Sequence, residues 1–157
     1  MSSALTVRNR TRAGALDIPL LRRIALALLR ELLDRQDFEL GLYVVDAKEM
    51  TQLNQTHLRH RGPTDVITFD YGDPAQPRRL AGEIFVCLDE AVRQAARYHV
   101  TWQSEIARYL VHGVLHLAGY DDAAAASRRH MKKREDLLVR ALGRRFRLRQ
   151  LGGHVSH

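Results

Sequence analysis

Cysteine is nearly absent from this sequence of 157 residues, which contains only Cys87. A lone cysteine excludes an internal disulfide, and its place at the end of the apolar run IFVC predicts a buried thiol. A structural zinc site rich in cysteine is excluded as well, because such a site needs several thiolates. These observations favour a protein of a reducing compartment.

Long apolar runs are also lacking, since none approaches the roughly 18 residues that a membrane span requires. The opening segment, MSSALTVRNRTRAG, has no apolar stretch like that of a secretory signal. Its arginine content faintly resembles an organelle transit peptide, but a strand predicted from Leu5 leaves little room for one. We therefore expect a cytoplasmic protein with no membrane partner.

Acidic residues are scarce in the C-terminal part of a chain whose formal net charge is +7. Ten of the 25 lysines and arginines lie between Arg128 and Arg149, against only Glu135 and Asp136. Arginine is the more frequent of the two, and its planar guanidinium suits bidentate contacts with phosphate. The pattern favours a polyanionic partner such as RNA; a solvated, Arg-rich helix face is the alternative.

Hydrophobic periodicity predicts a single domain in which strands and helices interleave without a regular βαβ repeat. The expected strands are residues 5–10, 38–45, 66–71 and 82–87, and the expected helices are 17–35, 47–58, 89–99, 101–119 and 123–143. This order favours an α+β fold with one mixed sheet. We expect the domain to span residues 1–143 and the basic residues 144–157 to form a loosely ordered tail.

Three helix ends are marked by specific residues. Asp17, with Pro19 just after it, suits the start of the first helix, and Thr101 suits the start of the fourth. Gly119 suits the end of that fourth helix, because glycine readily takes the positive φ angle of a helix C-terminus.

The string HGVLHLAGYDD, from His112 to Asp122, carries the clearest chemical signal. His112 and His116 are four residues apart in a helical segment, so both rings leave the same face of that helix. Gly119 can turn the chain back, which would bring Asp122 to the two rings as a third ligand. Two imidazoles and a carboxylate leave a fourth position open for water, as in catalytic zinc sites. We predict one Zn²⁺ per chain on this helix-turn segment, although other divalent metals suit the same ligands.

A structural interpretation of the same string is also open. His112 and His116 could be partly buried histidines whose hydrogen bonds are satisfied, and Asp121 and Asp122 could cap the last helix. The two interpretations are compatible if Asp121 caps and Asp122 ligates.

Several separated blocks of the sequence resemble the YbeY family of metal-dependent, single-strand-specific endoribonucleases. Residues 112–121 match the family pattern H-G-x-L-H-L-x-G-Y-D at every position. The segment LNQTHLRHRGPTDVITF, from Leu53 to Phe69, is similar to the block L-N-x(8)-P-T-D-V-L-S-F, and GEIFVC is similar to a G-D/E-I-x-I strand. The resemblance covers roughly residues 40–140. It implies a mixed sheet of about four strands packed against helices, with a metal at the mouth of a basic cleft.

The sequence departs from the family pattern at two positions. Asp122 stands where the family has its third histidine ligand; a carboxylate can bind zinc at a similar distance but makes a bound water less acidic. Leu58 stands where the family has an arginine, and Arg59 and Arg61 flank it. We assign the role of the missing arginine to Arg59.

The resemblance implies cleavage of RNA in 16S rRNA maturation and ribosome quality control. The expected catalytic residues are Arg59, His112 and His116, with the metal on His112, His116 and Asp122. Arg59 would stabilise the charge that develops on the phosphorus, while the metal polarises a phosphoryl oxygen. The expected RNA-binding residues are Arg59, Arg61, Arg128, Arg129, Lys132 and Lys133.

Two rival functions remain. One is an RNA- or ribosome-binding assembly factor without catalysis, whose metal is structural. The other is a metalloprotease of the metzincin type, because the spacing H-x-x-x-H-x-x-G-x-x-D is shared. In those enzymes a glutamate base follows the first histidine, whereas here the residue is Gly113, which argues against proteolysis.

Overall fold

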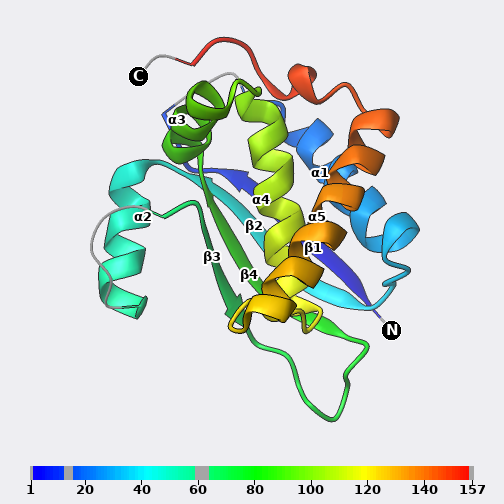
Figure 1. Cartoon of the computed structure of the whole chain (residues 1–157). Coiled ribbons are helices and arrows are strands. Elements are labelled where there is room, and N and C mark those ends of the chain that lie inside the picture. Colours follow the sequence, from blue (N-terminus) through cyan, green and yellow to red (C-terminus); the bar gives the residue numbers. More distant parts are fainter. Residues whose placement is uncertain (1, 13–15, 59–63, 156–157) are drawn as a thin grey trace.

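The computed structural model describes residues 2–12, 16–58 and 64–155, apart from the side chains of residues 57 and 58 (Figure 1). Its strands are β1 (Ser3–Asn9), β2 (Phe38–Val45), β3 (Val66–Asp70) and β4 (Leu80–Cys87). Its α-helices are α1 (Ile18–Leu26), α2 (Ala47–Leu53), α3 (Leu88–Tyr98), α4 (Trp102–Leu117) and α5 (Ala125–Arg145). Two π-helical segments, η1 (Ala27–Leu32) and η2 (Asn54–Leu58), continue α1 and α2.

The four strands form one mixed sheet in the order β1-β2-β4-β3. β1 pairs with β2 and β2 with β4 in parallel, whereas β3 pairs antiparallel with β4. In the register Leu42 lies opposite Ile84 and Tyr43 opposite Phe85. Because side chains alternate along a strand, these two pairs lie on opposite faces of the sheet. The α+β fold with a mixed sheet of four strands is confirmed.

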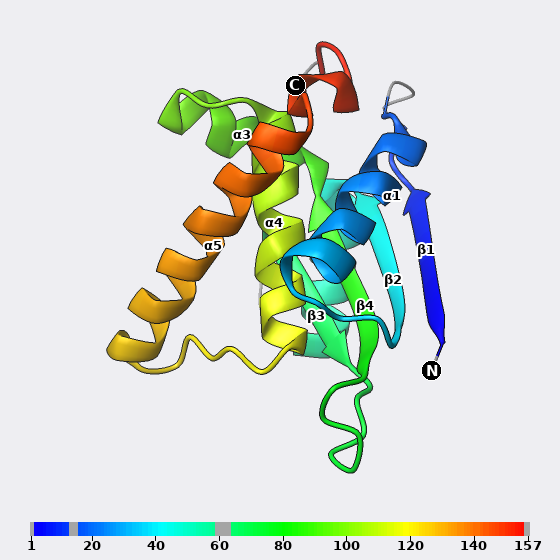
Figure 2. The ribbon, with the colours of Figure 1, turned by 90° about the vertical axis from the view of Figure 1, so that its right-hand side faces the viewer.

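Each face of the sheet has its own hydrophobic cluster. The larger cluster joins residues of α1, α4 and α5 to one face and includes Leu42 and Ile84. Figures 1 and 2 show these three helices together on that side. The smaller cluster lies on the other face, where Met50 of α2 packs with Phe85 and Cys87. The prediction of a buried Cys87 is confirmed, and burial raises the pKa of its thiol to about 11.

The predicted helix starts are confirmed. Asp17 accepts a hydrogen bond from the Leu20 backbone N–H at 2.9 Å, and Thr101 Oγ1 accepts one from Ser104 N–H at 3.1 Å. Each bond satisfies an amide that the first turn of a helix leaves without a partner.

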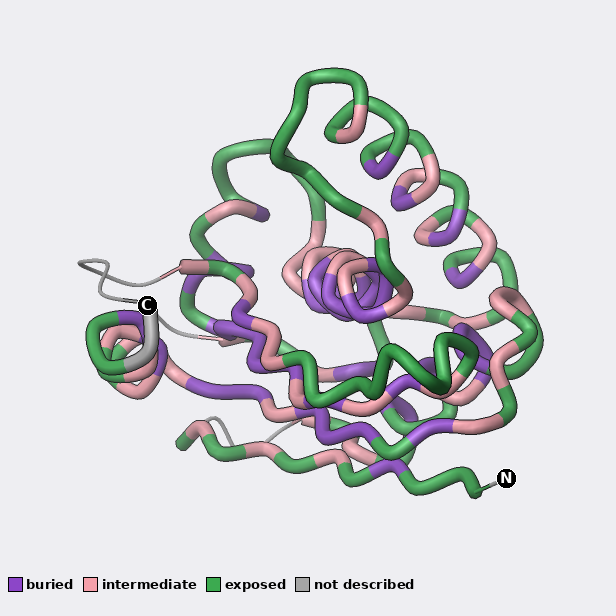
Figure 3. The backbone as a smooth tube through the Cα atoms, turned by 90° about the horizontal axis from the view of Figure 1, so that it is seen from below, coloured by how far each residue is buried: buried purple, intermediate pink, exposed green. Residues whose placement is uncertain are grey.

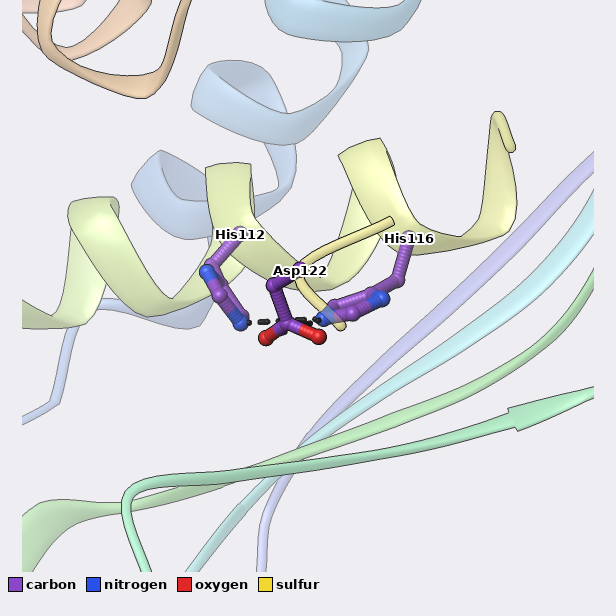
Figure 4. A group of neighbouring side chains, drawn as sticks. All are labelled: His112, His116 and Asp122. Carbon is purple, nitrogen blue, oxygen red and sulfur yellow. Dashed lines mark hydrogen bonds and ion pairs between the residues drawn. The ribbon is translucent and has the colours of Figure 1, made fainter. Parts of the chain in front are cut away.

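Helix α4 runs through the centre of the molecule, where Figure 3 shows it end-on with most of its residues buried. Its Gly113 lies against β4: a Cβ atom at this position would be 2.7 Å from Cγ2 of Ile84. The close approach therefore depends on the missing side chain. His112 and His116 lie on a different face of α4 from Gly113, and Figure 4 shows both rings on the same side of the helix.

Helix α5 packs on α4 through a buried stripe formed by Met131, Glu135, Leu138 and Leu142. These residues recur at three- and four-residue steps, as a single helix face requires. One member of the stripe, Glu135, is charged.

The segment after α5 is packed, in contrast to the loosely ordered tail that we expected. The Leu151 side chain is fully buried in a short 3₁₀ helix (Leu148–Leu151), and the Leu151 carbonyl accepts a hydrogen bond from Asp17 N–H at 2.7 Å. Trp102 Nε1 donates to the Gly153 carbonyl and Gln103 Nε2 to the Gly152 carbonyl. The partners that hold this segment are distant in the sequence, so local periodicity did not predict its packing. No helix in the described part of the chain is long and apolar enough to cross a membrane.

Candidate metal centre

His112 and His116 project from the same face of α4, one helical turn apart (Figure 4). Their Nε2 atoms lie 3.1 Å from each other, and each side chain is about one-third exposed, at 31% and 29%. The buried residues on the other side of α4 hold the helix in place. The predicted convergence of the two rings is therefore present.

The turn after α4 brings the chain back to these rings. Gly119 has a φ angle of 99° and donates its N–H to the His116 carbonyl, while Tyr120 N–H donates to the Leu115 carbonyl. This pair of hydrogen bonds is a Schellman motif, which ends a helix and reverses the chain. The predicted role of Gly119 is confirmed.

Asp122 follows the turn, and its carboxylate lies between the two imidazoles (Figure 4). Its Oδ2 atom is 3.5 Å from Nε2 of His116. Arg128 holds this segment by donating to the carbonyls of Asp122 and Ala123. Asp121 accepts from Ala123 N–H in a local turn, and α5 begins after Ala124 without a side-chain cap, so neither aspartate caps α5.

The donor atoms of His112, His116 and Asp122 all lie within 4.8 Å of one another. Zinc–nitrogen distances of about 2.0–2.1 Å and tetrahedral angles place two ligand atoms roughly 3.3 Å apart. The observed separations of 3.1 and 3.5 Å lie on either side of that value. The three residues could therefore hold a divalent metal ion.

A buried carboxylate lies behind His112, on the side away from the other two ligands. Glu135 Oε1 is 2.9 Å from Nδ1 of His112, and only 7% of the Glu135 side chain is exposed. Arg108 Nη1 donates to Glu135 Oε2 and to Asp136 Oδ1, both at 2.7 Å. Lys132 Nζ donates to Glu135 Oε2 at 3.3 Å. Both oxygens of the buried carboxylate are therefore occupied.

This arrangement shifts the pKa values of the two histidines in opposite directions. Burial alone lowers the pKa of His112, but the hydrogen bond and charge of Glu135 outweigh burial and raise it. The pKa of His116 is lowered by burial and by the neighbouring His112. Burial raises the pKa of Glu135, but the hydrogen bonds from His112 and Arg108 outweigh it and lower the value to about 2. Glu135 is therefore an anion at neutral pH.

A cavity of about 410 Å³ adjoins two of the three candidate ligands, His112 and Asp122. His112, Asp122 and Glu135 line it together with the basic residues Arg128 and Lys132. These two basic side chains also border the outer surface of α5, where Arg129 and Lys133 lie. Basic side chains thus run from the edge of the cavity, whose lining also includes the acidic residues Asp65 and Glu105, onto the outer face of α5.

The structure brings together most of the residues that we selected from the sequence. The three candidate ligands converge, and Arg128 and Lys132 reach their cavity, whereas Arg129 and Lys133 lie outside it. Arg59 and Arg61 lie outside the described residues.

Two residues of the centre, Glu135 and Arg108, were missed in the sequence. The signal that could have identified Glu135 was its position in the helical repeat. It occupies a place in α5 where the spacing from Met131 and Leu138 predicts an apolar residue.

The sequence matches the family described as Endoribonuclease YbeY over residues 7–143. A protein of Chlorobium luteolum named Endoribonuclease YbeY is 34% identical over 140 residues, which cover 89% of this chain and 98% of that protein. One of the same name from Alkaliphilus metalliredigens is 28% identical over 151 residues, covering 91% and 97% of the two chains. The solution structure of TM1509 from Thermotoga maritima superposes with a TM-score of 0.64 at 25% identity, covering 89% of this chain and 92% of that one. The chain belongs to the Endoribonuclease YbeY family.

Proposed function

We propose that this protein is a metal-dependent endoribonuclease that cleaves single-stranded RNA. The observation that carries the proposal is the convergence of His112, His116 and Asp122 beside a cavity that Arg128 and Lys132 also line, in a member of a family named for RNA cleavage. The proposed substrate is ribosomal RNA, in 16S maturation and ribosome quality control in the cytoplasm. The proposed cofactor is one Zn²⁺ per chain, and another divalent ion fits the same ligands.

The residues around the cavity suit the handling of a phosphodiester. When bound, the divalent ion supplies a Lewis acid for a phosphoryl oxygen. Arg128 and Lys132 bind phosphates of the RNA strand on one wall, and they place the scissile group beside His112 and Asp122. Arg59, four residues before the segment PTDV in the sequence, is the proposed group that stabilises the developing negative charge.

Proteolysis of the metzincin type is disfavoured by packing as well as by sequence. The glutamate base of those enzymes would occupy position 113, where even a Cβ atom would meet Ile84. The residue packs against Ile84 of β4, on a different face of α4 from the candidate metal ligands. A general base at this position would require α4 to move away from β4.

Non-catalytic RNA binding is the second candidate, and one observation favours it. Arg129 and Lys133 are exposed beside Arg128 and Lys132 on the outer face of α5, beyond the cavity of the metal centre. Such a surface can bind phosphates without any metal. The two candidates differ in whether RNA is cleaved.

The deciding experiment measures metal content and cleavage of a single-stranded RNA by the purified protein. We expect about one ion per chain, cleavage that a chelator abolishes, and restoration by added Zn²⁺. His116→Ala is expected to lose both metal and cleavage, and His130→Ala, at an exposed histidine outside the ligand group, serves as a control that retains both. Cleavage that persists in full without metal and in His116→Ala contradicts the proposal. If the protein binds RNA but does not cleave it in the presence of any added metal ion, the result supports non-catalytic RNA binding.

The contribution of the α5 surface can be measured separately through salt dependence. Arg129→Ala and Lys133→Ala are each expected to weaken RNA binding and to reduce the slope of log K against log salt by about one. The measurement is a binding titration over a series of salt concentrations. Slopes equal to that of the unmodified protein would remove this surface from the RNA path.

A further inference from the structure

We propose that Glu135 is a positioning residue that keeps the proton of His112 on Nδ1, so that the lone pair of Nε2 faces His116 and Asp122. The part of this proposal that concerns metal affinity rests on the proposed function. The part that concerns the tautomer is a property of the protein alone.

The position of Glu135 in the fold indicates a special role. It occupies the buried stripe of α5 between Met131 and Leu138, where an apolar side chain would extend the core. A buried carboxylate is costly unless it is paired and hydrogen-bonded. A local choice that costs stability points to a function for the residue.

The hydrogen-bond partners of Glu135 determine the direction of its bond to His112. Arg108 and Lys132 donate to Oε2, which leaves Oε1 to face the imidazole. An ionised carboxylate can only accept hydrogen bonds, so Nδ1 of His112 must be the donor. A neutral His112 then carries no proton on Nε2, the atom 3.1 Å from Nε2 of His116. Metal-binding histidines generally need this arrangement, in which the second nitrogen donates to a carboxylate or carbonyl.

Because Arg108 donates to residue 135, replacing one carboxylate oxygen by an NH₂ group determines which end of that side chain faces His112. In Glu135→Gln the side chain keeps its shape but has one carbonyl oxygen and one NH₂ group. Arg108 and Lys132 are both donors and select the oxygen, which turns the NH₂ group towards His112. Nδ1 must then accept, so the proton moves to Nε2, the atom needed for the metal. The matched control is Asp136→Asn, which removes the same charge from the next residue and from the same Arg108 partner without touching His112.

The first experiment reads the tautomer of His112 by long-range ¹H–¹⁵N NMR in metal-free protein. It is carried out at a pH above the titration of the His112 ring itself, whose pKa Glu135 raises, so that the ring is neutral. We expect the Nδ1–H form in the unmodified protein and in Asp136→Asn, and the Nε2–H form in Glu135→Gln. An Nε2–H form in the unmodified protein, or an unchanged tautomer in Glu135→Gln, overturns the proposal.

The second experiment measures Zn²⁺ affinity by competition with a chromophoric chelator. Glu135→Gln is expected to weaken binding about 10- to 100-fold, as removal of such hydrogen-bond partners generally does. Asp136→Asn is expected to bind as the unmodified protein does, and equal affinities for all three proteins overturn the role of Glu135 in metal binding. If the unmodified protein takes up no Zn²⁺, the proposed function fails, whereas the tautomer measurement still decides the assignment of Glu135.

Discussion

The candidate ligands come from two regions of different character. His112 and His116 lie on a 16-residue helix that is buried on its other side, and Glu135 supports His112. Asp122 lies on the exposed segment between α4 and α5, and 49% of its side chain is exposed. The helix presents its two donors already aligned, whereas the loop must be held by the Gly119 turn and by Arg128. We therefore expect the helix to provide most of the metal affinity of the proposed site and the loop to close it.

Removing a ligand from the helix is expected to have the largest effect. His116→Ala leaves one imidazole and one loop carboxylate, and we expect Zn²⁺ affinity to fall about 1,000-fold, which is roughly 4 kcal/mol. Competition with a chelator measures this change. His130→Ala is the control, because this exposed histidine stacks on Tyr120 and is absent from the ligand group. A loss of Zn²⁺ affinity below tenfold in His116→Ala would show that the helix ligands do not provide most of the metal affinity.

Adding the metal is expected to order the loop more than the helix. At a Zn²⁺ concentration about 100 times Kd, amides in residues 119–123 that exchange by loop opening are expected to exchange about 100-fold more slowly, or roughly 2.7 kcal/mol. The buried amides of α4, which already require larger unfolding events, are expected to change less. Hydrogen exchange with and without Zn²⁺ measures both regions. Equal protection in the two regions would contradict the comparison.

Removing the loop ligand is expected to have a smaller effect than removing a helix ligand. In Asp122→Ala a water can take the vacated ligand position, so we expect affinity to fall about tenfold, or roughly 1.4 kcal/mol. Asp122→His restores a ligand type that also binds zinc, and it is expected to retain one ion per chain. Metal analysis of the two variants provides the test. Unchanged metal affinity in Asp122→Ala would remove Asp122 from the site.

Straining the turn that carries the loop is expected to lower the stability of the fold by about as much as loss of the loop ligand lowers metal binding. Gly119→Ala forces a side chain onto a positive φ angle, which costs about 1–2 kcal/mol of unfolding free energy. Gly143→Ala is the control, because this glycine lies within α5 with open space around it. There alanine is expected to stabilise by about 0.5–1 kcal/mol. Denaturant unfolding of both variants measures the difference. If Gly119→Ala keeps the unfolding free energy of the unmodified protein, the turn does not require glycine.

Local signals in the sequence predicted the parts of the molecule that local forces determine. The bounds of β2 and the caps Asp17 and Thr101 follow from alternation and from hydrogen bonds within one turn. Gly119 and the histidine pair follow from helix geometry in the same way. In each case the interacting groups lie a few residues apart, so their spacing contains the information.

The missed features depend on partners that are distant in the sequence. Glu135 looks like one of several charged residues on a basic helix until α5 is placed against His112 on α4. The segment after α5 has one buried leucine and two arginines, and its packing depends on Trp102 and Gln103 in another helix. The π-helical continuation of α1 was also missed, because its side chains follow nearly the same apolar pattern as an α-helix.

The packed segment after α5 has a consequence for the order in which the molecule assembles. The hydrogen bond from Asp17 to Leu151 closes a loop that contains most of the described chain, whereas every residue of the metal centre lies between Arg108 and Asp136. The entropy lost on closing a loop increases with its length, so contacts within this short stretch cost less to form than the final closure. The ligands can therefore meet once α4 and α5 pair, and an ion bound at that stage would stabilise the hairpin of two helices before the two ends of the domain join.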